Sequence, residues 1–89
     1  MLVRRRLVVH GVVQGVGFRA FVWRAAQQRG VAGRARNRPD GTVAVVLEGE
    51  LDAVADVVRA CHDGPRGAVV TEVELYEEEP EGLSDFDAG

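Results

Sequence analysis

A turn near the middle of the chain most limits the folds that are open to it. Asp40-Gly41 separates two extended runs, 31–39 and 42–47, and such a pair between extended runs is a strong signal for a β-hairpin. A strand pattern and then a helical pattern precede this hairpin, and a helical pattern and then a strand pattern follow it. The order strand, helix, two-stranded hairpin, helix, strand predicts an α+β, ferredoxin-like βαββαβ fold, with two helices on one face of a mainly antiparallel sheet.

Both predicted helices show apolar stripes at helical spacing. The first covers 19–29 and ends before Gly30, a common C-terminal cap. The second opens with the acidic stretch 48–52, where negative charge suits the helix dipole, and stops at Gly64-Pro65. The stripes consist of Phe18, Phe21, Val22, Ala25 and Ala26 in the first helix and of Leu51, Val54, Ala55, Val58 and Cys61 in the second.

The outer strands are predicted over 6–10 and 69–76. In the second of these, Val69 should share a face with Thr71, Val73 and Leu75, and residues 83–86 could add a short closing strand. A chain of 89 residues is the size of one domain. We therefore predict a single domain over 4–89, preceded by an arm of three residues.

Charge is divided unevenly along the chain. Residues 1–39 carry nine Arg and no acid, whereas residues 40–89 carry all fourteen acids and only two Arg. This bias favours an anionic ligand for the first half. The chain has no Lys, which excludes Schiff-base chemistry on lysine.

Several other classes of protein are disfavoured. Cys61 is the only cysteine, so an internal disulfide is impossible, and on its apolar stripe it should be a small buried residue. No apolar run approaches the roughly 20 residues of a membrane span, and no signal peptide is expected. The strands lack the exposed aromatic pairs that stack nucleic-acid bases. We predict a cytoplasmic protein with neither a membrane nor a nucleic-acid partner.

A glycine-rich stretch, 11–17, joins the first strand to the first helix. It has three glycines, and Arg19 follows at the start of the helix. Free amide groups, the helix dipole and a guanidinium together suit a bound anion. The stretch lacks the Lys of a Walker loop and the third glycine of a dinucleotide fingerprint. His10, just before it, is expected to be a structural hydrogen-bonding residue.

Asn37 is the second candidate at this site. In the predicted fold the loop after the first strand can lie close to the second strand, which carries Asn37. Neither carboxylates nor histidines have metal-ligand spacing in this region. Chemistry here would depend on positioning and electrostatics. The residues alone leave open whether the anion is only bound or also reacts.

Two stretches, 11–19 and 33–43, followed by Glu48-Gly49, resemble the signature motifs of the acylphosphatase family. The resemblance covers residues 4–89 and implies hydrolysis of the carboxyl-phosphate bond of a small-molecule acyl phosphate. It further implies that neither a metal nor another cofactor is needed. By this resemblance Arg19 binds the phosphoryl group and Asn37 orients the attacking water.

Further expectations concern the details of binding and reaction. The phosphate should be held by the loop and helix start, and the substrate's own phosphate should accept the proton of the water. The protein is expected to be a monomer. The residues predicted to bind the phosphate are Gln14, Gly15, Val16, Gly17, Phe18 and Arg19.

One position departs from the family pattern. Arg34 stands where an aromatic residue commonly follows the glycine of the second motif, which should alter local packing without loss of activity. Two alternatives remain. The chain could be a phosphate-binding module without turnover, or a domain of a larger enzyme, because similar modules open the hydrogenase-maturation carbamoyltransferases.

Overall fold

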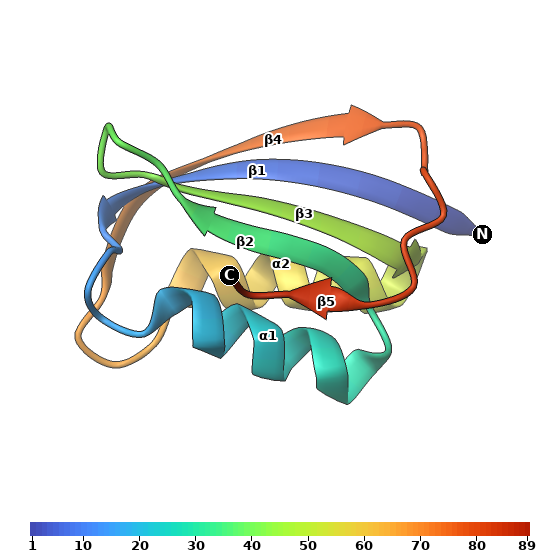
Figure 1. Ribbon diagram of the computed structural model, residues 1–89, viewed down its shortest axis with the longest axis horizontal. Coiled ribbons are helices and arrows are strands. Elements are labelled where there is room, and N and C mark those ends of the chain that lie inside the picture. Colours follow the sequence, from blue (N-terminus) through green and yellow to red (C-terminus); the bar gives the residue numbers. More distant parts are fainter.

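Five strands form one sheet, and both helices cover the same face of it (Figure 1). The computed structural model describes all 89 residues. The strand order is β4-β1-β3-β2-β5, and only the pairing of β2 with β5 is parallel. The predicted ferredoxin-like arrangement is confirmed. The elements are β1 (Leu2–Val12), α1 (Phe18–Arg29), β2 (Ala32–Asn37), β3 (Val43–Glu50), α2 (Leu51–Asp63), β4 (Val69–Glu78) and β5 (Phe86–Asp87).

The core lies between the sheet and the two helices. Because strand side chains alternate between faces, every second residue of the central strands points toward the helices. Cys61 is buried, as predicted. The sheet contributes Leu7, Val9, Ala35, Val43, Val45 and Leu47, and the helices contribute Phe18, Val22, Ala26, Val54, Val57 and Cys61.

The predicted start of the second helix is wrong. Glu48 and Glu50 are the last residues of β3, and α2 begins only at Leu51. Glu48 belongs to the sheet because it stands opposite Arg4 of β1 and Ala32 of β2. Its buried carboxylate accepts a hydrogen bond from Arg4, at 2.7 Å.

The apolar stripe of α2 is rotated from the predicted one. Val57 is fully buried, whereas Leu51 is 42% exposed. Val54, Val57 and Cys61 face the core, so the side of α2 that carries Leu51 points toward the sheet edge instead. The partly exposed Leu75 of the edge strand β4 lies there, and it lines a shallow groove together with Leu51.

The first and last long strands also differ from their predictions. β1 begins at Leu2, within the expected arm, because Leu2 pairs with Glu50. In β4 the register shifts opposite Gly11, so the predicted alternation breaks and Val69 is 56% exposed. Gly11 has φ +123°, and an added Cβ would lie 2.0 Å from the carbonyl oxygen of Val69. Only glycine allows this close approach of the two strands.

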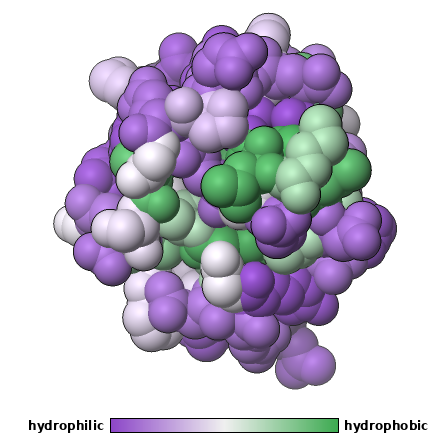
Figure 2. Space-filling view, turned by 90° about the vertical axis from the view of Figure 1, so that its right-hand side faces the viewer, coloured by the Kyte–Doolittle hydropathy of each residue, from purple (hydrophilic) through white to green (hydrophobic).

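The end of the molecule at which β1 begins lies opposite the loop that joins β1 to α1 (Figure 1). Figure 2 faces this end and shows one apolar area within a mostly hydrophilic surface. The most exposed large apolar side chains of the chain are Met1 and Leu2. Neither helix has the length and hydropathy needed to cross a bilayer.

Candidate active site

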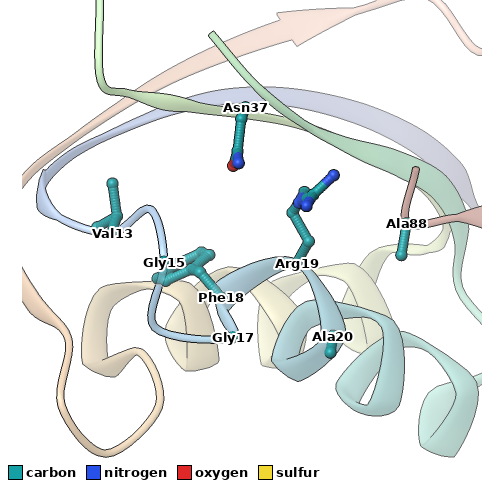
Figure 3. Close-up of a pocket in the computed structure, with 8 residues that line it drawn as sticks. All are labelled: Val13, Gly15, Gly17, Phe18, Arg19, Ala20, Asn37 and Ala88. Carbon is teal, nitrogen blue, oxygen red and sulfur yellow. The ribbon is translucent and has the colours of Figure 1, made fainter.

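A pocket of about 240 Å³ lies at the end of the molecule where β1 passes into α1 (Figure 3). It brings together residues from three parts of the chain. Arg19 and Asn37, the two predicted catalytic residues, both line it. The full lining is Val13, Gly15, Gly17, Phe18, Arg19, Ala20, Asn37 and Ala88.

The loop before α1 depends on two glycines. Gly15 has φ 76° and Gly17 has φ 79°, a left-handed conformation that is costly for other residues. An added Cβ at either position would meet nothing within 4 Å, so the backbone conformation and not the space requires glycine. The loop is anchored on both sides by the buried side chains of Val13 and Phe18.

The amide groups of this loop have no partners within the protein. None of the N–H groups of residues 15–19 donates a hydrogen bond to another atom of the chain. The N-cap Gly17 supplies no side-chain cap, and the first turn of α1 contains no acidic residue. These free donors and the positive end of the helix dipole make this segment a suitable site for an anion.

The two polar side chains of the pocket are also free. Arg19 takes part in no ion pair, and neither Arg19 nor Asn37 makes a side-chain hydrogen bond within the protein. Figure 3 shows Asn37 reaching down from β2 and Arg19 rising from α1 toward the same space. A guanidinium and a carboxamide are thus available to a ligand over a set of free amide donors.

Gln14 and Val16, both predicted to bind phosphate, do not line this pocket. The carboxamide of Gln14 donates to the carbonyl oxygens of Arg38, at 2.7 Å, and Thr42, at 2.8 Å. It therefore joins the loop to the turn that follows Asn37. The side chain of Val16 packs against the core.

The turn between β2 and β3 is the predicted Asp-Gly hairpin turn. Asp40 accepts hydrogen bonds from the backbone N–H of Thr42, at 3.0 Å, and from its hydroxyl, at 2.6 Å. These hydrogen bonds, that of the hydroxyl first, lower the pKa of Asp40 below its usual value. The carboxylate stabilises the turn that positions Asn37 at the end of β2.

His10 and Arg34 lie outside the pocket. Nε2 of His10 is 2.5 Å from a carboxylate oxygen of Glu74 on the neighbouring strand β4. The Tyr76 hydroxyl also donates to Glu74, and these two contacts, that of Tyr76 first, lower the pKa of Glu74. His10 is therefore a structural hydrogen-bonding residue, as expected from the sequence.

Other groups that often carry chemistry are not arranged for it. The chain contains no group of three or more His, Cys, Asp or Glu side chains that could hold a metal ion. Burial raises the pKa of the Cys61 thiol to about 12, so the reactive thiolate is scarce at neutral pH. No sequence pattern indicated that Ala88 would line the pocket, because its position depends on the two-residue strand β5.

Comparison with known proteins identifies relatives of this chain. The family model described as Acylphosphatase matches residues 5–88. An acylphosphatase of Nostoc sp. is 51% identical over 86 residues, which are 97% of this chain and 85% of the relative. The crystal structure of acylphosphatase from Bacillus subtilis superposes with a TM-score of 0.93 at 40% identity, and covers 98% of this chain and 97% of that one.

A larger protein contains a similar region. Full-length HypF, crystallised in the phosphate- and nucleotide-bound form, matches with a TM-score of 0.91 at 31% identity. The match covers 98% of this chain but only 12% of HypF. The relatives that match over most of their own length are acylphosphatases. The chain therefore belongs to the acylphosphatase family of hydrolases.

Proposed function

We propose that residues 4–89 form one catalytic domain that hydrolyses the carboxyl-phosphate bond of small acyl phosphates without a metal ion. One observation supports this proposal above all. Residues with free N–H groups, namely Gly15, Gly17, Phe18 and the unpaired Arg19, line a pocket that Asn37 also lines. The products are a carboxylate and inorganic phosphate.

In this proposal the loop and Arg19 bind the phosphoryl group. The N–H groups of residues 15–19 donate to its oxygens, and the guanidinium fork of Arg19 adds a fixed charge. Because the carboxamide of Gln14 is engaged by the hairpin turn, any contact of Gln14 with phosphate falls to its main chain. In related phosphoryl transfers such an arginine accelerates the reaction by about 10³–10⁵-fold.

Asn37 is proposed to orient the attacking water. Its carboxamide oxygen accepts a hydrogen bond from the water, whose oxygen then attacks phosphorus. The bond between phosphorus and the acyl oxygen breaks, and its electron pair leaves with the carboxylate. The proton of the water passes to a phosphate oxygen of the substrate, because a carboxamide is too weak a base at neutral pH to take it.

The alternative is a module that binds phosphate without turnover. The free amide donors and Arg19 would serve that role equally well. Asn37 favours the enzyme, because phosphate binding alone does not call for a free carboxamide on the opposite strand. The two functions differ in a direct assay.

The test is hydrolysis of benzoyl phosphate in the presence of a chelator. We expect turnover that the chelator leaves unchanged, and a flat pH–rate profile near neutrality. Asn37→Ala should lower kcat by about 10²-fold, since a misplaced reacting group costs that much. The inhibition constant of this variant for inorganic phosphate should change little, because we assign phosphate binding to the loop N–H groups and Arg19.

Three results would count against parts of this proposal. No turnover with intact phosphate binding would favour the binding module. Unchanged kcat in Asn37→Ala would remove the water-orienting role. A sharp inflection at a histidine-like pKa would require a general base that the proposal does not contain. The cytoplasmic location and the monomeric state stay predictions from the sequence.

A further inference from the structure

A second hollow, of about 550 Å³, lies directly beside the active-site pocket. Ala20 and Ala88 line both, so the two are adjacent. The hollow is formed where α1 faces the residues of and around β5. Its other lining residues are Trp23, Asp85, Phe86, Asp87 and Gly89.

Trp23 is the largest side chain of this hollow. It follows Arg19 by four residues and Ala20 by three, so all three lie on the same side of α1. The buried side of the helix consists of Phe18, Val22 and Ala26, and Trp23 is 42% exposed. The core therefore leaves much of the indole exposed one turn from the proposed phosphate site.

The position of the hollow suits the acyl side of the substrate. In Figure 3, Asn37 and Arg19 extend into the pocket, and Ala20 and Ala88 lie at its border. These two alanines also line the hollow of Trp23. An acyl group attached to a phosphoryl group in the pocket would reach the hollow by passing them.

The carboxylates that line the hollow favour an uncharged acyl group. Asp87 forms an ion pair with Arg36, at 2.8 Å, whereas Asp85 takes part in no ion pair. An acyl group carrying a second phosphate or a carboxylate would meet the unpaired carboxylate of Asp85. An aromatic or aliphatic acyl group would instead cover apolar surface of Trp23.

From these observations we propose that the hollow beside Trp23 binds the acyl side of the substrate and selects uncharged, apolar acyl groups. The inference rests on the proposed acyl phosphate hydrolysis. It assigns to Trp23 a role in specificity, separate from the phosphate-binding and water-orienting roles of Arg19 and Asn37.

The first test compares kcat/KM for benzoyl phosphate and acetyl phosphate. We expect Trp23→Ala to lower the ratio of the two by about five- to tenfold, because only the benzoyl ring reaches the indole. Tyr76→Ala is the matched control. This aromatic residue is 39% exposed and lies on β4, outside both cavities, so its loss should leave the ratio unchanged. An equal effect of Trp23→Ala on both substrates would overturn the inference.

The second test uses fluorescence, because Trp23 is the only tryptophan of the chain. Benzoylphosphonate, in which a carbon–phosphorus bond replaces the scissile linkage, should change the emission of the unmodified protein on binding. Inorganic phosphate should displace the phosphonate and restore the original emission. Bound phosphonate without an emission change would overturn the inference.

The two tests separate this inference from the function on which it rests. If no acyl phosphate is hydrolysed, the proposed function fails, and the fluorescence titration still decides whether the hollow receives the acyl side. If both substrates are hydrolysed with a ratio that Trp23→Ala leaves unchanged, the function stands and the specificity role of Trp23 is refuted.

Discussion

Two arginines near opposite ends of the molecule have contrasting surroundings. Arg4, near the start of β1, is 5% exposed and pairs with Glu48 at 2.7 Å and Glu78 at 3.0 Å. Arg19, at the start of α1, has no ion pair and lies beside N–H groups that donate to nothing in the chain. The first arginine is fully used by the fold, and the second is left free for a ligand.

The end of the molecule that holds Arg4 is organised around one carboxylate. Besides Arg4, Glu48 accepts hydrogen bonds from the N–H groups of residues 81–83, at 2.8, 3.0 and 3.0 Å. This holds the segment that leads from β4 to β5, and thereby to Ala88 in the active-site pocket. No buried side-chain nitrogen or oxygen of the chain lacks a hydrogen-bond partner, and such pairing is what allows buried polar groups to stabilise a fold. The free donors near Arg19 contribute no such stability. Substitutions near Arg19 should therefore lower activity and not stability, whereas substitutions near Arg4 should lower stability and not activity.

The largest expected effect is that of Arg19→Ala. Turnover of benzoyl phosphate should fall by about 10³–10⁵-fold, because the charge that develops on the phosphoryl group loses its guanidinium. The free energy of unfolding should rise by about 0.5 kcal/mol, since a cation in the first turn of a helix opposes the dipole. Enzyme kinetics and urea unfolding measure the two quantities.

A matched control is Arg24→Ala on the same helix. Arg24 is exposed, has no ion pair and does not line the pocket. Its loss should leave turnover within about twofold of the unmodified protein. If Arg19→Ala lost stability together with activity, the contrast between the two arginines would be refuted.

Glu48→Gln should have the opposite pattern. Removing one partner of a buried ion pair costs about 3 kcal/mol of unfolding free energy, and a neutral carboxamide cannot accept all four hydrogen bonds as well as the carboxylate does. The kcat of folded protein should stay within about threefold, because Glu48 does not line the pocket. Glu50→Gln, at an exposed position of the same strand, is the control and should cost less than about 1 kcal/mol.

The same carboxylate predicts a dependence of stability on pH. Burial of Glu48 would raise its pKa, but the combined hydrogen bonds from the 81–83 amides and from Arg4 outweigh it and lower the pKa from 4.5 to about 2. A carboxylate whose pKa is depressed in the folded state stabilises the fold fully at pH values above its unfolded-state pKa. This contribution should be lost as the pH falls from about 4.5 to about 2.

Urea unfolding of the unmodified protein and of Glu48→Gln over this pH range isolates the effect. Carboxylates with lowered pKa values that share no partner with Glu48, such as Asp40, affect both proteins alike. The difference in stability between the two should therefore shrink toward low pH. A difference that stays constant from neutral pH to about pH 2 would mean that the ionised carboxylate of Glu48 does not stabilise the fold.

The sequence predicted the fold and the pocket through local signals. The Asp40-Gly41 turn defined the hairpin, and the order of elements around it placed Arg19 and Asn37 at one end of the sheet. The turn and the order of the elements are both recognised from residues that are close together in the chain. Helix stripes and turns are of this kind, and they were sufficient to bring the two candidate residues together.

What the sequence could not predict depends on distant partners. An acidic stretch is typical of a helix start, and only the contacts of Glu48 with Arg4 and with residues 81–83 reveal it as part of a strand. The exposure of Val69 depends likewise on the register shift opposite Gly11. Such contacts between distant segments leave no periodic pattern in the sequence.

Gln14 belongs neither to the paired groups around Arg4 nor to the free groups around Arg19. Its carboxamide connects the loop that we propose to bind phosphate to the turn after Asn37, and it does so without lining the pocket. Gln14→Ala should lower kcat/KM for benzoyl phosphate about tenfold, equivalent to about 1.4 kcal/mol, because loop and strand lose their fixed spacing. Gln27→Ala, an exposed change on α1, should have no effect.

The kinetic and unfolding data together decide to which class Gln14 belongs. A positioning role predicts a fall in kcat together with a loss of about 1 kcal/mol of unfolding free energy, the usual worth of such hydrogen bonds. If stability falls and kcat stays the same, Gln14 acts on the fold alone, as Arg4 does. In that case the spacing between the loop and Asn37 is maintained by the sheet, and the free groups of the pocket need no further support from the turn.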